Sequence, residues 1–162
     1  MPNGKPFAKP SFGELLRNYP TEATAFGEGG TIINNSNYEH TCALRLSVAL
    51  TRWNKDLMNE FTGNMARDTA RSTTLPYARG AKALADYLKA DYVMWSPMRL
   101  GSFHAAMRLR EQGIIFWTNT GTVDHIDLFA GASLNLPAGR RRSMLWAPQR
   151  HQFVHAAFWR LG

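Results

Sequence analysis

Cysteine is nearly absent from this sequence, since Cys42 is the only one in 162 residues. A single thiol cannot form a disulfide within the chain, which excludes a disulfide-stabilised fold. The roles left for Cys42 are packing as a small apolar side chain, chemical reactivity, or an intermolecular bond.

Long hydrophobic runs are also missing. No apolar stretch reaches the roughly 18 residues of a transmembrane helix, so we expect no membrane insertion. Residues 1–10 contain two lysines and three prolines but no apolar run behind them, unlike a secretory signal peptide. The sequence therefore predicts a protein made in the cytoplasm without a signal peptide.

Acidic residues are absent after Asp127, whereas five arginines follow it, and the net charge of the chain is +7. A basic surface attracts polyanions such as nucleic acid, anionic lipid or an anionic cell-wall polymer. Hydrophobic residues make up 44% of the chain and charged residues 19%, which favours a packed globular core. We expect a flexible arm over residues 1–10 and a single domain over 11–162.

The hydrophobic pattern changes from helical to strand-like along the chain. Helical spacing and capping signals predict helices from Ser11 to before Pro20, over 41–53, over 78–89, and over 102–112 with Gly113 at its C-terminal end. Residues 54–76 are polar and are predicted to be irregular. Alternating or β-branched runs predict strands over 114–117, 123–129 and 152–161. Helices followed by strands predict an α+β fold with an antiparallel sheet packed on the Cys42 helix.

Cys42 lies at the predicted start of its helix. Unpaired backbone N–H groups and the helix dipole favour negative charge there, and therefore the nucleophilic thiolate. Thr41 can cap this helix, and the backbone N–H of Cys42 is a natural donor to an oxyanion. The position is suited to a cysteine hydrolase as well as to packing.

A cysteine hydrolase also needs a base and a group that orients the base. His125 is the best candidate base because it lies within a predicted strand beside Ile126. Asp127 shares the face of His125 in a strand, while Asp124 points to the other face. Asn135 is a second candidate orienting residue, since a returning strand after Gly131 would pass His125.

Four segments resemble a known family. Residues 38–50, with the pattern Cys-x-x-Arg-x-Ser from Cys42, resemble the nucleophile helix of the type VI secretion amidase effectors of the fourth family. Residues 10–15, 113–116 and 125–131 resemble its first helix, the strand before the histidine and the histidine strand, in the same order. The resemblance implies a papain-like fold of the NlpC type with Cys42 as nucleophile and His125 as general base.

The same resemblance implies what the protein does. It predicts a cofactor-free peptidoglycan amidase that cuts the bond between D-glutamate and diaminopimelate in bacterial stem peptides. Such an antibacterial toxin is delivered by the type VI secretion apparatus, acts in the periplasm of the target cell, and is blocked by a cognate periplasmic immunity protein.

Two positions depart from the family pattern. Asp124 stands where a glycine usually precedes the histidine, and Leu136 stands where the family has its third catalytic residue, an aspartate. Asparagine can orient an imidazole, so Asn135, next to Leu136, completes the predicted catalytic set of Cys42, His125 and Asn135. Asp127 is the alternative.

Two other classes of function compete with the hydrolase. The run Arg140–Arg142, with Trp146 and His151 nearby, suits a nucleic-acid-binding module in which arginines hold phosphates and aromatic rings stack on bases. The spacing of His151 and His155 suggests a metal site, although zinc sites need three or four close ligands.

Overall fold

The computed structural model describes residues 4–20, 42–68, 73–119, 124–130 and 153–162, which form a mixed structure of helices and strands. The prediction of an α+β chain is confirmed. The helical elements are α1 (Phe12–Asn18), α2 (Cys42–Trp53), the 3-10 helix η1 (Lys55–Met58), α3 (Ala81–Lys89) and α4 (Phe103–Arg108). The strands are β1 (Met65–Asp68), β2 (Thr73–Ala78), β3 (Met98–Leu100), β4 (Gly113–Asn119), β5 (His125–Phe129) and β6 (Phe153–Arg160).

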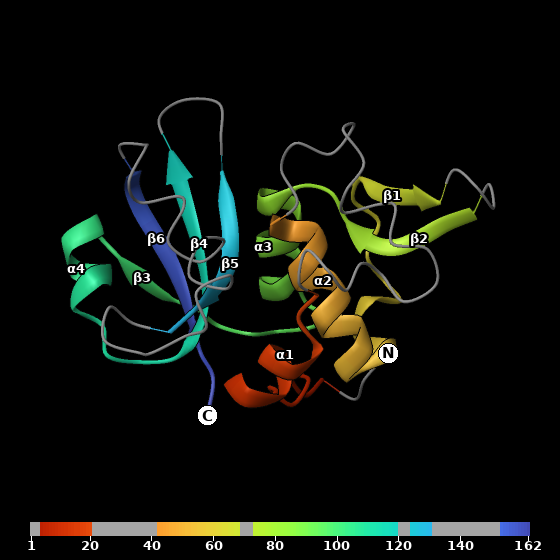
Figure 1. The fold of residues 1–162 in the computed structure, drawn as a ribbon, viewed down its shortest axis with the longest axis horizontal. Helices are drawn as coiled ribbons and strands as arrows, with labels where there is room; N and C mark the ends of the chain where they lie inside the picture. The colour runs from red at the N-terminus through yellow and green to blue at the C-terminus, as the bar shows by residue number, and fades with distance from the viewer. Residues whose placement is uncertain (1–3, 21–41, 69–72, 120–123, 131–152) are drawn as a thin grey trace.

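The larger sheet has four strands in the order β3-β6-β4-β5, and every neighbouring pair is antiparallel. The predicted strands over 114–117, 123–129 and 152–161 correspond to β4, β5 and β6. The short strand β3 was not predicted. In Figure 1, α2 and α3 lie on one side of this sheet and α4 lies on the other.

Both faces of the sheet are buried. The main hydrophobic cluster joins Ile114, Ile126 and Leu128 of the sheet to side chains of α1, α2 and α3. A second cluster lies on the other face and includes α4. Its buried members are Leu100, Ala106, Ile115, Trp117, Phe129, Ala156 and Phe158. Burial on both faces explains why residues 114–117 are a continuous apolar run rather than an alternating one.

The helix α1 begins as the sequence predicts. The Ser11 hydroxyl accepts from the backbone N–H of Glu14 (3.3 Å), and the Glu14 carboxylate accepts from the backbone N–H of Ser11 (2.7 Å). This reciprocal capping box satisfies two donors that the first helical turn leaves unpaired. Phe12 and Leu15 then turn into the main cluster.

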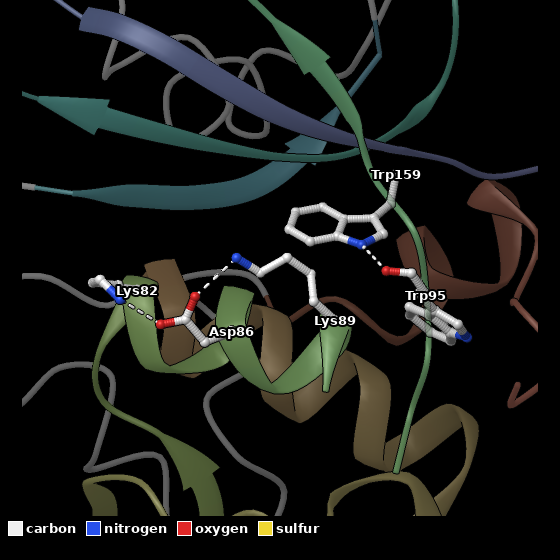
Figure 2. A network of polar contacts seen from close by, with 5 residues as sticks. All are labelled: Lys82, Asp86, Lys89, Trp95 and Trp159. Carbon is white, nitrogen blue, oxygen red and sulfur yellow. Dashed lines mark hydrogen bonds and ion pairs between the residues drawn. The ribbon is translucent and has the colours of Figure 1, made fainter. Parts of the chain in front are cut away.

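Part of the expected N-terminal arm contacts the rest of the chain. The backbone carbonyl of Phe7 accepts a hydrogen bond of 2.8 Å from the indole of Trp95, and the Phe7 ring contacts that of Tyr92. The indole of Trp159 in turn donates to the backbone carbonyl of Trp95 at 2.9 Å (Figure 2). These bonds join the N-terminal segment, the residues after α3 and the last strand.

Figure 2 also shows the exposed side of α3, where the Asp86 carboxylate pairs with the ammonium groups of Lys82 and Lys89. Such i,i+3 and i,i+4 pairs on a solvated helix face contribute little to stability. Among the described residues, no helix is long and apolar enough to cross a membrane.

The prediction that residues 54–76 are irregular is wrong in part. The helix η1 and the two-stranded antiparallel sheet of β1 and β2 lie in this region and extend to Ala78. Consequently the next helix, α3, begins at Ala81 rather than at residue 78. Pro76 within β2 lowers the strand signal, but a two-stranded sheet has a free edge on each strand where a missing N–H is tolerated.

Gly113 has a different role from the predicted one. The helix α4 already ends at Arg108, and Gly113 is the first residue of β4. A Cβ atom at this position would lie 2.2 Å from the backbone carbonyl oxygen of Trp159 and 2.7 Å from the Phe158 ring. Glycine is therefore needed here because the backbone of β6 approaches closely.

We expect Gly113→Ala to lower the free energy of unfolding by about 1–3 kcal/mol, because the added methyl group overlaps β6. Gly101→Ala is the matched control, since a Cβ atom there would meet no heavy atom within 4 Å. Chemical denaturation of both variants measures the difference. Equal stability of the two variants would contradict the close approach.

Candidate active site

Cys42 is the first residue of α2, and its side chain is half-buried against the main hydrophobic cluster. The residues that follow it on the inner face of the helix, among them Leu46, Ala49 and Leu50, are fully buried. The apolar stripe therefore places the N-terminal end of α2 at the edge of the core. Backbone N–H groups in the first turn of a helix have no partner within the helix, so they are available to bind a negative charge.

Ser47 attaches α2 to the smaller sheet. Its hydroxyl is fully buried, donates to the backbone carbonyl of Leu44 (2.9 Å) and accepts from the backbone N–H of Ala78 (3.0 Å). The serine of the Cys-x-x-Arg-x-Ser pattern thus satisfies a buried backbone donor at the end of β2. It fixes the helix on the side away from β5.

His125 and Asp127 lie on β5, which forms one edge of the sheet. Their register partners on β4 are Trp117 and Ile115. His125 is 5% exposed and Asp127 is fully buried. The two side chains share one side of the strand, as the sequence predicts.

The imidazole of His125 lies between Asp127 and Cys42. Its Nε2 atom is 3.6 Å from Oδ2 of Asp127, an ion-pair distance longer than a hydrogen bond, and its side chain also interacts with that of Cys42. Burial disfavours the charged imidazolium, but the interactions of the ring with Asp127 and Cys42 raise the pKa of His125 to about 10. The protonated imidazole is therefore the stable form beside these two acidic groups.

The other carboxylate oxygen of Asp127 is held by two donors. The hydroxyl of Tyr19 and the backbone N–H of Leu128, the latter at 2.8 Å, both donate to Oδ1. Burial and the nearby negative charge of Asp127 keep the pKa of Tyr19 well above its usual value. The phenol therefore stays protonated and acts as a donor.

Two arginines of α2 hold the segment that carries Tyr19. Arg45 donates to the backbone carbonyl of Pro20 (3.1 Å), and Arg52 donates to that of Asn18 (3.3 Å). Tyr19 lies between these two carbonyls as the C-terminal cap of α1. The helix α2 and the segment that carries Tyr19 are therefore joined directly.

Of the predicted site residues, Cys42, His125 and Asp127 lie in the described part of the chain. The structure brings together Cys42, His125 and Asp127. Asn135 and Thr41 lie outside the described residues, so the role predicted for Asn135 stays a prediction. Tyr19 was not predicted, because nothing in a tyrosine before a proline points to an aspartate 108 positions away.

The residues behind the competing readings lie mostly outside the described part of the chain. This applies to Arg140–Arg142, Trp146 and His151, whereas His155 is described on β6 opposite Thr118. Within the described ranges, no group of three or more His, Cys, Asp or Glu residues is arranged to hold a metal ion.

Comparison with known proteins finds a shared fold. A chain of the effector–immunity system Tae4/Tai4 from Salmonella typhimurium superposes with a TM-score of 0.65 at 17% identity, covering 96% of this chain and 100% of its own. The type VI effector Tae4 from Enterobacter cloacae gives a TM-score of 0.63 at 19% identity, over 98% and 100% of the two chains. No family model and no curated protein matches the sequence. The chain thus has the fold of these effectors.

We expect Ser47→Ala to reduce the free energy of unfolding by about 1–3 kcal/mol, because the buried N–H of Ala78 would lose its acceptor. Thr51→Ala is the matched control, since the Thr51 hydroxyl bonds only to a carbonyl of its own helix in the described contacts. Denaturant titration of both variants tests this. A loss no larger for Ser47→Ala than for Thr51→Ala would argue against the attachment.

Proposed function

We propose that this protein is a cysteine amidase that cleaves the bond between D-glutamate and diaminopimelate in peptidoglycan stem peptides. In this proposal Cys42 is the nucleophile and His125 is the general base, within a papain-like domain of the NlpC type. Asp127 orients His125 in place of the Asn135 that the sequence predicts. The observation that carries the proposal is a buried His125 whose imidazole lies 3.6 Å from the Asp127 carboxylate and interacts with Cys42 at the start of α2.

The arrangement supports the attack on an amide carbon. A thiolate at the start of α2 attacks the carbonyl, and the oxyanion that forms accepts a hydrogen bond from the backbone N–H of Cys42. The imidazolium of His125 then donates its proton to the leaving amine, and the C–N bond breaks. A thioester between Cys42 and the glutamyl side of the substrate remains.

Hydrolysis of the thioester completes the cycle. Neutral His125 takes a proton from water, the hydroxide oxygen attacks the thioester carbon, and the thiolate leaves. The imidazolium and thiolate are regenerated together. A negative Asp127 behind Nε2 favours the charged imidazole at both stages.

We further propose that the protein is an antibacterial effector delivered by type VI secretion into the periplasm of a target cell. The Tae4 proteins that share its fold are type VI effectors, and several were solved in complexes with the immunity protein Tai4. A chain that hydrolyses cell wall endangers its own producer. A cognate periplasmic immunity protein that covers the Cys42 site follows from the proposal.

The direct test is digestion of purified peptidoglycan, followed by mass spectrometry of the fragments. We expect Cys42→Ala and His125→Ala to reduce the release of diaminopimelate amino groups by at least about a thousandfold, because each removes a reacting group. His155→Ala, a histidine of β6, is the control and retains activity. Unchanged cleavage by folded Cys42→Ala would overturn the proposal.

The orienting residue is tested by a second pair of variants. The Oδ1 position of Asp127 is occupied by two donors, so in Asp127→Asn the amide NH₂ faces Nε2 and imposes the wrong tautomer on His125. We expect a loss of kcat of at least about a hundredfold for Asp127→Asn, by analogy with other triads. We expect a minor loss for Asn135→Ala. The reverse order would assign the role to Asn135.

The same variant changes the pH dependence. Loss of the negative charge disfavours the imidazolium, so the pKa of His125 falls from about 10. The alkaline limb of the kcat/KM profile, which reports loss of the imidazolium, therefore moves to lower pH in Asp127→Asn. Asp124→Asn, with the same charge change one residue before His125, keeps the wild-type limb.

A further inference from the structure

We infer that Tyr19 is a positioning residue, whose hydroxyl fixes the Asp127 carboxylate so that Oδ2 is presented to Nε2 of His125. The inference rests on the proposed amidase function, in which Asp127 orients His125. It assigns a role to a residue at the end of α1, outside both elements that carry the proposed reacting groups.

The carboxylate of Asp127 could rotate about its last side-chain bond and exchange its two oxygens. Both described hydrogen bonds to the group, from Tyr19 and from the backbone N–H of Leu128, go to Oδ1. They reach the same oxygen from different elements. Two donors on Oδ1 favour the rotamer that leaves Oδ2, 3.6 Å from Nε2, for the imidazole.

The Leu128 N–H alone is a weaker restraint. It belongs to the residue next to Asp127 and moves with β5. Tyr19 is the C-terminal cap of α1 and ties the carboxylate to a different part of the chain, 108 positions away. Because both side chains are buried, this hydrogen bond acts where little water competes for either partner.

The position of Tyr19 is itself restrained on both sides. Arg45 and Arg52 of α2 bond to the carbonyls of the residues that flank it. The backbone N–H of Tyr19 also bonds to the carbonyl of Leu16, which closes the end of α1. The arginine of the Cys-x-x-Arg-x-Ser pattern therefore links the Cys42 helix to the tyrosine that restrains Asp127.

The test compares Tyr19→Phe with Tyr87→Phe. Both variants remove one hydroxyl from a buried tyrosine, and the Tyr87 hydroxyl bonds to the backbone carbonyl of Leu57 at 2.6 Å, away from the site. We expect Tyr19→Phe to lower kcat on peptidoglycan fragments roughly ten- to a hundredfold, because the base is less well placed. KM stays within about twofold, since the change affects positioning rather than substrate binding. Tyr87→Phe leaves both constants near their wild-type values.

A spectroscopic measurement keeps this test separate from the amidase proposal. The proton on Nε2 of His125 gives an NMR resonance that is identified by its loss in His125→Gln. We expect this resonance to shift or broaden in Tyr19→Phe and to stay unchanged in Tyr87→Phe, with no substrate present. An unchanged resonance together with unchanged kcat in Tyr19→Phe overturns the inference. If the wild-type protein cuts no peptidoglycan but the resonance still changes in Tyr19→Phe, only the amidase proposal is overturned.

Discussion

A buried carboxylate is the constraint on which the site depends. Asp127 is fully buried on a strand whose neighbours Ile126 and Leu128 belong to the main hydrophobic cluster. A charged carboxylate in such surroundings is costly unless donors and a positive group surround it. The Tyr19 hydroxyl and the Leu128 N–H donate to one oxygen of this carboxylate, and the His125 imidazole lies 3.6 Å from the other. The negative charge of Asp127 favours protonated His125. Because this charge also needs the Tyr19 hydroxyl as a donor, the end of α1 must stay in contact with β5.

The helix α2 is held in place by both apolar and polar side chains. Its apolar face fills the core, while Ser47 and Arg45 make specific bonds to β2 and to the end of α1. Hydrophobic contact alone would tolerate small shifts of a helix along its axis or around it. The directional bonds define one position. The same bonds therefore fix the position of the Cys42 thiol, at the first residue of α2, relative to His125 on β5.

Sequence patterns predicted the elements whose signals are local. The capping box of α1, the apolar stripe of α2 and the runs of β4 and β5 each depend on residues close in the chain. The features that were missed depend on tertiary contacts. Residues in β2 become a strand by pairing with β1 despite Pro76, and Gly113 is explained only by the nearby carbonyl of Trp159. The contact of Tyr19 with Asp127 is of this second kind.

The residues of the site are far apart in the sequence, and this separation affects when the site can form during folding. Tyr19 and Asp127 are 108 positions apart, and Cys42 meets His125 across several intervening elements. A contact between such distant residues forms only after the entropy cost of closing the long segment between them has been overcome. An extended or partly collapsed chain therefore holds the thiol and the imidazole apart. If the chain is the proposed amidase, its hydrolytic activity requires the completed tertiary structure, and the unfolded chain is inactive.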